Sequence, residues 1–263
     1  MNNTAPAKQR SAAVIASVLA MALQSAVAAS EIEATTTQAK PMAHTTHESG
    51  VSQTLTARQQ AIVPIAAFAA TGDLPELNNA LNQGLDAGLT ISDNKEILSQ
   101  LYAYAGFPRS LNALNELMRV LQARKQRGMT DEIGQEPSKA IPTGKALLEA
   151  GTANQTKLSG APVKSALFDF APAVDEYLKT HLFGDIFERD NLDWRDRELA
   201  TVAMLSAMPG VEPQLQAHIR ISMNVGLTAG QLQQLAQVLT DRVGTHSGQR
   251  AQEALKQHLS RGG

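Results

Sequence analysis

One stretch of the sequence resembles a later stretch. Each matching residue of the later stretch follows its counterpart by the same number of positions, the distance from Gly88 to Gly226. The triplet Gly88-Leu89-Thr90 recurs as Gly226-Leu227-Thr228. Chance matching among Leu- and Ala-rich helices is the alternative, but three consecutive matches with flanking glycines at the same spacing argue against it. Internal similarity of this kind indicates a duplicated structural unit. The other matching pairs are Gly72 and Gly210, Leu77 and Leu215, Leu101 and Leu239, and Gly106 and Gly244.

The repeated triplet has the pattern of a turn between two helices. Gly88 and Gly226 suit the C-terminal cap of a preceding helix, where a left-handed backbone favours glycine. Thr90 and Thr228 are each followed three residues later by an acid or an amide, the spacing of a capping box. Each unit is therefore predicted to contain a helix, a Gly-x-Thr turn and a returning helix.

Apolar residues elsewhere recur at helical spacing. Stripes with the period of an amphipathic helix cover residues 97–105, 111–121 and 199–206. Alternating β-branched runs bounded by turn pairs are absent from the sequence. The predicted fold class is all-α, with two helical repeats packed together. Pro64 lies inside the first apolar stretch and is expected to break or kink that helix.

Residues 1–29 have the order of a secretory signal. Lys8 and Arg10 precede an apolar run over residues 12–23, and small residues follow, ending in an A-x-A site at Ala26 to Ala28. A membrane anchor is the alternative, but about 20 apolar residues are needed to span a bilayer. We therefore expect an exported protein, periplasmic or secreted, that is not attached to a membrane after cleavage.

The rest of the chain divides into four parts. Residues 30–54 are rich in Thr and Ser and are predicted to form a flexible polar tether. The first repeat is predicted over residues 55–127 and the second over residues 173–263. A linker over residues 128–172 separates them, with one short helix near residues 146–150. An extra helix is predicted over residues 174–187, where its apolar side chains pack between the repeats.

Composition excludes several functional classes. The chain has no Cys and a formal net charge of −2. The absence of Cys rules out disulfides, thiolate metal sites and thiol nucleophiles. A charge so near neutrality, without a basic stripe, predicts no nucleic-acid partner. The motifs of serine hydrolases, zinc proteases, phosphate loops and dinucleotide-binding folds are also absent, and no metal site is predicted.

The motifs in their order resemble the carboxymuconolactone decarboxylase family. In the first unit they are residues 88–90 (Gly-Leu-Thr), 96–98 (Glu-Ile-Leu), 104–108 (Tyr-Ala-Gly-Phe-Pro) and 111–114 (Leu-Asn-Ala-Leu). In the second they are residues 192–199 (Leu-Asp-Trp-Arg-Asp-Arg-Glu-Leu), 216–218 (Gln-Ala-His) and 226–228 (Gly-Leu-Thr). The resemblance implies the helical fold of AhpD-like thiol peroxidases and assembly into a homo-oligomer. It also implies either lactone decarboxylation or cysteine-based peroxide reduction.

Chemistry separates these two activities. Peroxide reduction needs an attacking and a resolving thiol, and this chain has none. Decarboxylation needs no cofactor, but it needs an acid/base group and a site for the carboxylates of a small-molecule substrate. The leading hypothesis is therefore a cofactor-independent lyase or isomerase that acts on a small carboxylated lactone or related acid. The alternative is a non-catalytic ligand-binding or scaffolding protein on the same fold.

Candidate catalytic residues follow from the hairpin and the resemblance. His218 lies eight residues before Gly226, and Glu96 lies eight residues after Gly88. The resemblance places a His at the first position and an acid at the second, so each unit retains one half and no intact His/Glu pair is visible. His218 is the candidate general acid/base. Its alternative role is that of a hydrogen-bonded structural residue, and the alternative for Glu96 is an exposed charge.

The remaining candidates would complete a composite site. Tyr104 is a catalytic candidate and Gln100 a substrate-binding candidate, contributed by the other unit or another subunit. Tyr104 has the alternative of simply packing at a helix end. Arg58 and Arg197 recur near the start of the two units and would bind substrate carboxylates bidentately. Their alternative is an ion pair that anchors the repeat, which the neighbouring acids Asp196 and Glu198 favour.

Overall fold

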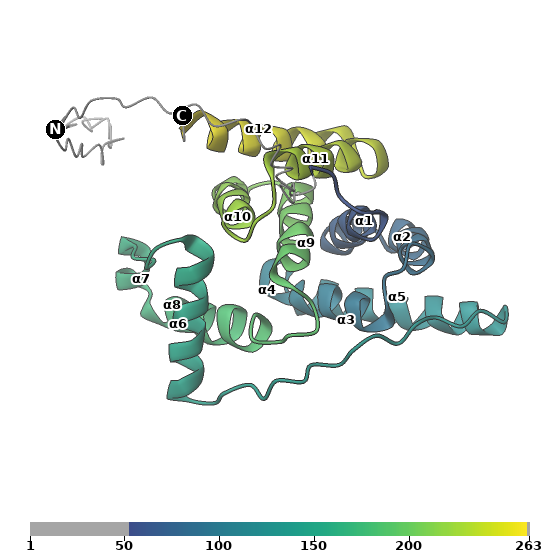
Figure 1. Cartoon of the computed structure of the whole chain (residues 1–263), viewed down its shortest axis with the longest axis horizontal. Coiled ribbons are helices and arrows are strands. Elements are labelled where there is room, and N and C mark those ends of the chain that lie inside the picture. The colour runs from purple at the N-terminus through teal and green to yellow at the C-terminus, as the bar shows by residue number, and fades with distance from the viewer. Residues whose placement is uncertain (1–52, 262–263) are drawn as a thin grey trace, which may run out of the picture. The chain divides into compact units, whose positions relative to one another are not determined.

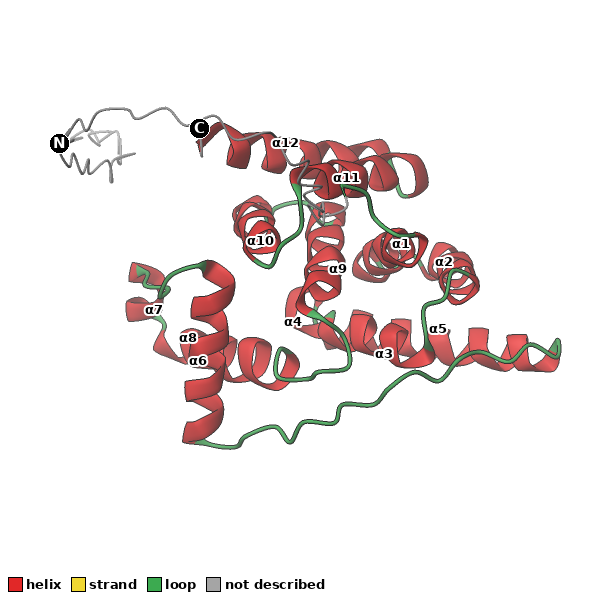
Figure 2. Ribbon diagram, viewed as in Figure 1, coloured by secondary structure: helices red, strands yellow, loops and turns green. Residues whose placement is uncertain are grey.

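The computed structural model describes residues 53–261, and every regular element in that part of the chain is a helix (Figures 1 and 2). The predicted all-α fold is confirmed. The first repeat contains α1 (Ala57–Thr71), α2 (Leu74–Asp86), α3 (Ile91–Gln100), α4 (Tyr102–Ala105) and α5 (Phe107–Gln126). The second repeat contains α9 (Trp194–Ala207), α10 (Glu212–Asn224), α11 (Ala229–Arg242) and α12 (Thr245–Arg261).

The helix boundaries repeat with the offset found in the sequence. Shifted by the separation of Gly88 from Gly226, the starts of α2, α3 and α5 coincide with the starts of α10, α11 and α12. Thr90 and Thr228 each accept a hydrogen bond from the backbone three residues later, and both capping boxes are complete. Gly88 and Gly226 have φ angles of 91° and 96°, which L side chains rarely adopt. The two repeats therefore share the same capping interactions at corresponding helix ends.

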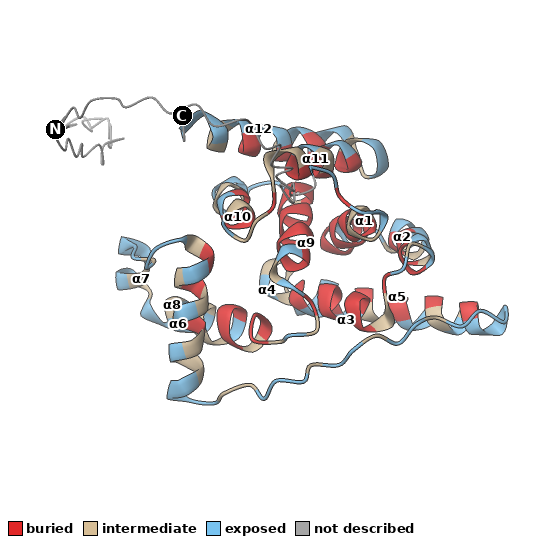
Figure 3. Cartoon of the chain, in the orientation of Figure 1, coloured by how far each residue is buried: buried red, intermediate tan, exposed pale blue. Residues whose placement is uncertain are grey.

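The core is organised around α1 and α9, which pack against each other. Every residue from Ala61 to Ala70 is buried, as is every residue from Asp196 to Ala207 (Figure 3). A helix that is buried on all sides needs neighbours on all sides. Helices α2, α3, α5 and α11 pack on α1, and α4, α10, α11 and α12 pack on α9. The two repeats thus share one hydrophobic core.

Of the break or kink predicted at Pro64, the break does not occur. Helix α1 continues from Ala57 through Pro64 to Thr71. A proline inside a helix costs about 3 kcal/mol because it removes one backbone hydrogen bond and crowds the preceding turn. Pro64 is itself buried in the middle of the most enclosed stretch of α1. Burial of the apolar side chains around it offsets that cost.

The segment between the repeats is more structured than predicted. In place of a short helix near residues 146–150, α6 (Lys145–Ser159) has 15 residues, and α7 (Ala166–Phe170) follows it. Before α6, a long loop returns along α3, which it joins through backbone hydrogen bonds from Ile91 and Ser92 (Figure 2). The Gly- and Pro-rich composition of this segment thus predicted the loop but did not indicate the length of α6.

The helix predicted over residues 174–187 forms as two pieces, α8 (Pro172–Tyr177) and the π-helix η1 (Leu178–Ile186). Its apolar side chains pack with α6 and with residues of both repeats, which confirms the predicted packing between the units. The buried members of this cluster are Leu158, Leu182, Phe183, Ile186, Phe187 and Ile221, with Tyr102, Tyr104, Leu178, Trp194 and Val225 against them.

Within residues 53–261, no helix has the length and apolar character that a membrane crossing requires. The predicted signal segment, residues 1–29, lies outside the described residues, as does nearly all of the predicted tether over residues 30–54.

Candidate functional site

Polar and charged side chains are buried where the first repeat meets α9 and α10. Arg197 and Glu198 on α9 are 0% exposed, and so is Gln100 on α3. Glu96 on α3 and His218 on α10 are 3% and 7% exposed. Burial of a charge is costly unless the charge is paired and hydrogen-bonded. The hydrogen-bond and ion-pair partners of these side chains therefore indicate how the cluster is stabilised.

His218 is paired with Glu198. The imidazole Nδ1 lies 2.8 Å from Oε2 of Glu198, which comes from the neighbouring helix. A carboxylate at this distance accepts the Nδ1 proton, and it thereby orients the ring and leaves Nε2 as the atom that can exchange a proton. Glu198 has no exposed surface, whereas His218 keeps a small exposed fraction. What little of the pair is exposed therefore belongs to the imidazole.

Tyr104 contacts the same histidine from the first repeat. The rings of Tyr104 and His218 meet edge to face, with centroids 5.5 Å apart and planes inclined at 78°. Helix α4 is short, and Tyr104 lies near its end, directly before the turn at Gly106. Burial raises the pKa of the Tyr104 hydroxyl above its ordinary value, and the Glu198 carboxylate raises it further, while the Thr201 hydroxyl lowers it by less. Tyr104 is therefore held as a neutral proton donor beside His218.

Several polar atoms in this region lack a hydrogen-bond partner in bonding geometry among the described residues. They include the Tyr104 hydroxyl, Oε1 of Glu198 and Nε of Arg197, and the hydroxyl of Ser222 one turn beyond His218 on α10. Buried polar atoms are rarely left unpaired, because each one costs about 1–3 kcal/mol. A concentration of them around one His–Glu pair is typical of a site that receives a polar ligand or water.

Glu96 and Gln100 belong to a second network that shares Arg197. Glu96 accepts hydrogen bonds from Arg189 at 2.6 and 2.8 Å and from Arg197 at 3.0 Å. Burial favours the neutral form of Glu96, but these two guanidinium groups outweigh it and hold the carboxyl pKa below its ordinary range. Gln100 donates to the hydroxyl of Thr201 and to the backbone of Arg197. Glu96 is thus a buried, ionised anchor between repeats.

Arg58 lies at a further junction of the two repeats. Its guanidinium group contacts Asp93 at 2.9 Å and forms a hydrogen-bonded ion pair with Asp196. Arg197 is fully buried against Glu96. Both arginines are therefore occupied by carboxylates of the chain itself, which is the geometry of an ion pair that anchors the repeats. Their role in binding substrate carboxylates stays a prediction without support from these contacts.

The structure brings Tyr104 and His218 together, so the site is composite in the sense predicted: one side chain comes from each repeat. It places Glu96 with Arg189 and Arg197, and no described contact joins Glu96 to His218. No acid lies at the hairpin position opposite His218, as the sequence shows, but Glu198 of the second repeat pairs with His218 from another helix.

Sequence reasoning missed Glu198 because it searched for the acid on the returning helix of the hairpin. The carboxylate lies instead on α9, 20 residues before His218. One signal was available: Glu198 directly precedes the apolar run from Leu199 to Leu205 on a helix without a polar face. A charged residue at the edge of such a run is buried with it and needs a partner.

A sequence model described as the Carboxymuconolactone decarboxylase family matches the chain in two segments, residues 42–118 and 172–257. Together the segments make up more than half of the chain, and each covers most of one repeat. The chain belongs to the carboxymuconolactone decarboxylase family. No curated protein gives a significant match.

Both halves of the composite site lie within the segments matched to the carboxymuconolactone decarboxylase family. Tyr104 falls in the first segment, and Glu198 and His218 fall in the second. The predicted tandem arrangement of two AhpD-like repeats is therefore confirmed. Since this family member contains no Cys, its polar cluster cannot act through a thiol.

Proposed function

We propose that this protein is a cofactor-independent lyase or isomerase that acts on a small carboxylated lactone or a related acid, with His218 as the general acid/base. The observation that carries the proposal is the pair formed by His218 and Glu198, buried beside the unpartnered hydroxyl of Tyr104. A positioned histidine of this kind contributes about 10²–10⁴-fold to a proton-transfer step.

The chemistry of the proposed step matches these groups. When a carboxylate leaves as CO₂, the electron pair of the broken bond stays on carbon, and that carbon must receive a proton. A His218 ring oriented by Glu198 through Nδ1 presents Nε2 as the proton carrier. The Tyr104 hydroxyl, kept neutral by its raised pKa, would donate a hydrogen bond to an oxygen that gains charge in the same step.

One observation favours the alternative of a non-catalytic ligand-binding or scaffolding protein. Arg58 and Arg197, the two predicted anchors for substrate carboxylates, are both held in ion pairs within the chain. A site that lacks a free cation beside its histidine would bind a carboxylated substrate weakly. The carboxylates that form ion pairs with these arginines also join the two repeats, as a scaffolding protein requires.

A substrate screen separates the two functions. Full-length protein would be incubated with a panel of γ-lactone carboxylic acids and unsaturated dicarboxylic acids, with CO₂ release and the ultraviolet spectrum followed. The proposal expects turnover of at least one compound, abolished in His218→Ala and retained in His246→Ala. His246 is an exposed histidine near the start of α12 and serves as the matched control. No turnover of any compound would favour the binding function.

Export and homo-oligomer formation are part of the same proposal. Export is supported by the order of charged, apolar and small residues over residues 1–29, and oligomer formation by the family resemblance. Cell fractionation with amino-terminal sequencing of the purified protein tests export, and sedimentation analysis tests assembly. A protein that retains residues 1–29 inside the cell would contradict the first.

A further inference from the structure

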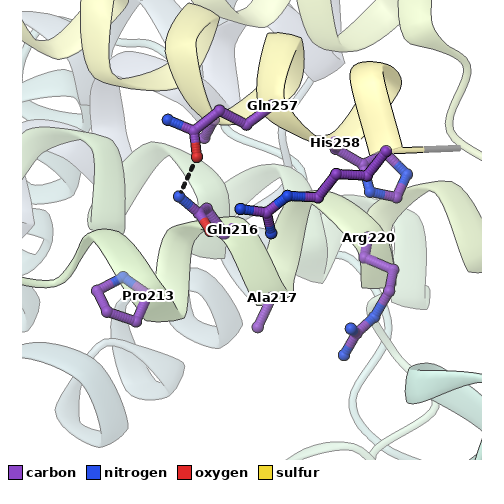
Figure 4. A pocket seen from close by; sticks show the side chains of 8 residues that line it. Pro213, Gln216, Ala217, Arg220, Gln257 and His258 are labelled. Atoms are coloured by element: carbon purple, nitrogen blue, oxygen red, sulfur yellow. Dashed lines mark hydrogen bonds between the residues drawn. The ribbon is translucent and has the colours of Figure 1, made fainter. Parts of the chain in front are cut away.

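A cavity lies between α10 and α12, outside the polar cluster around His218. Its volume is about 380 Å³. Pro213, Gln216, Ala217 and Arg220 line it from one face of α10, and Figure 4 shows Gln257 and His258 facing them from α12. The side chains of Gln216 and Gln257 are joined by a hydrogen bond of 2.5 Å across the two helices. Ala254 and Arg261 complete the lining.

The lining is cationic and contains no carboxylate. Arg220 and Arg261 supply two guanidinium groups, and His258 supplies an imidazole. Neither arginine forms an ion pair or a hydrogen bond with the described residues, although the chain as a whole is slightly acidic. Both arginines are exposed, and Figure 4 shows the Arg220 side chain extending away from α12. Long unpaired cations at the edge of one cavity attract oxygen anions, which they can turn toward and bind through paired N–H donors.

The first repeat provides an internal comparison, because α2 and α5 correspond there to α10 and α12. At the offset that relates the two repeats, Ala254 corresponds to Glu116 and Gln216 corresponds to Asn78. Glu116 is buried and accepts hydrogen bonds of 2.6 Å from both Asn78 and Arg119. In the first repeat, then, a carboxylate of the chain lies between the two helices and pairs with a cation.

The second repeat has lost that internal carboxylate. Ala254 stands in place of Glu116 and Gln257 in place of Arg119, so both members of that ion pair are lost, while Arg220 and Arg261 replace Asn82 and Ala123 as new cations. No acidic side chain lines the groove between α10 and α12, although Gln257 donates a hydrogen bond to Glu253 beside it. The divergence of the two repeats thus replaced a bonded acid with an open cavity. A volume of this size lies within the usual range for small-ligand sites, about 300–1,000 Å³.

From this comparison we propose that the groove between α10 and α12 binds a compact anion with two or more charged oxygens, such as a dicarboxylate or a phosphate. The ligand takes the place that the Glu116 carboxylate holds in the first repeat. Arg220 and Arg261 pair with its oxygens, and Gln216 and His258 provide polar contacts. Binding here links α10, which carries His218, to α12.

This anion site is independent of the proposed catalytic function. His218 is on α10 too, but it does not line the groove and is hydrogen-bonded to Glu198 on α9. Failure of one proposal therefore does not imply failure of the other. The variant His218→Ala distinguishes them, because it is expected to lose turnover and to keep anion binding.

Calorimetric titration of the full chain with inorganic phosphate and with succinate, at low and matched ionic strength, tests the inference. Arg220→Gln and Arg261→Gln are each expected to weaken binding at least about tenfold, since a charge-assisted hydrogen bond contributes about 1.5–3 kcal/mol. Lys256→Gln, which removes an exposed cation of α12 outside the groove, is the matched control and is expected to bind like the wild type.

A third variant restores the acid of the first repeat. Ala254→Glu is expected to abolish anion binding, because the new carboxylate forms ion pairs with the guanidinium groups in place of the anion. If Ala254→Glu does not fold, the two arginine variants still decide the question. Absence of binding to the wild type by either anion would overturn the proposal. So would loss of binding in His218→Ala, or equal binding by wild type, Arg220→Gln and Arg261→Gln.

Discussion

The Nδ1 atom of His218 lies 2.8 Å from Oε2 of Glu198, between two helices of the second repeat, and the ring of Tyr104 from the first repeat packs against the imidazole. Through this relationship the duplicated fold yields a single composite site. At the equivalent position of the first repeat His218 is replaced by Ala80, and α1, the counterpart of α9, contains no acidic residue. The first repeat thus contributes Tyr104, while the second carries the His218–Glu198 pair that we propose for proton transfer.

The first prediction concerns the tautomer of His218. With Glu198 accepting its proton, the neutral imidazole is expected to carry hydrogen on Nδ1 and none on Nε2. Nitrogen-15 NMR of histidine-labelled protein at alkaline pH measures this directly. In Glu198→Leu the Nδ1 preference is expected to disappear, whereas the exposed His246 keeps its signals in both proteins. A hydrogen on Nε2 in the wild type would contradict the assigned orientation.

A second prediction follows from the unpartnered hydroxyl of Tyr104. Since the Tyr104 hydroxyl has no hydrogen-bond partner in the described structure, Tyr104→Phe is expected to change the free energy of unfolding by less than about 1 kcal/mol, or to increase it. Turnover of any substrate found is expected to fall at least about tenfold. Urea unfolding and steady-state kinetics of the same preparation measure the two effects. A large loss of stability without loss of turnover would make Tyr104 a packing residue.

The buried ion pairs of Glu96 predict a pH-dependent stability. Because the pKa of Glu96 is held below its ordinary value, the stabilisation is present above the unfolded carboxyl pKa of about 4. It is lost as the pH falls through the lowered pKa of the folded state. Glu96→Gln is expected to reduce the free energy of unfolding by about 3 kcal/mol at neutral pH, with a smaller difference from wild type in acid.

The control for Glu96 is an exposed carboxylate. Glu136 pairs with Lys95 at the surface, where both side chains are about half exposed or more. Glu136→Gln is expected to cost less than about 1 kcal/mol at any pH. Urea unfolding of both variants at neutral and acidic pH gives the comparison. Equal losses for the two variants, or a Glu96→Gln loss that grows in acid, would show that the buried network does not stabilise the junction of the repeats.

The repeated caps predict matched effects in the two units. Thr90→Ala and Thr228→Ala each remove a side-chain acceptor from a complete capping box, and each is expected to lower the free energy of unfolding by about 1 kcal/mol. Thr245→Ala, at an exposed position, is expected to have little effect. Thermal and urea unfolding measure these changes. A neutral effect at either cap would show that the corresponding turn is held by packing alone.

The features that sequence reasoning predicted correctly are local ones. Some features depend on only a few neighbouring residues and can therefore be predicted from the sequence. Examples are the capping box of Thr90 and the left-handed turn at Gly226. The break predicted as one outcome at Pro64 does not occur, because tertiary burial stabilises the helix there. The length of α6 was missed because it is set by packing against η1 rather than by a strong apolar stripe of its own.

Only part of the candidate site was predicted from the sequence, for the same reason. His218 and Tyr104 were found through motifs, but the partner of His218 depends on how α9 lies against α10. Glu198 and Glu96 are both acids in helices, and only the fold separates the one that holds His218 from the one that holds Arg197. The ion pairs of Arg58 and Arg197 likewise join residues far apart in the sequence, beyond the reach of local patterns.

The most direct test of the central claim is the turnover of His218→Ala on the first substrate that the screen identifies, measured beside wild type and His246→Ala. The proposed role predicts a fall in kcat/KM of at least about 100-fold in His218→Ala. The folded state is expected to remain intact by circular dichroism, and His246→Ala is expected to react like the wild type. Turnover by His218→Ala at the wild-type rate would contradict the assignment of His218 as the general acid/base.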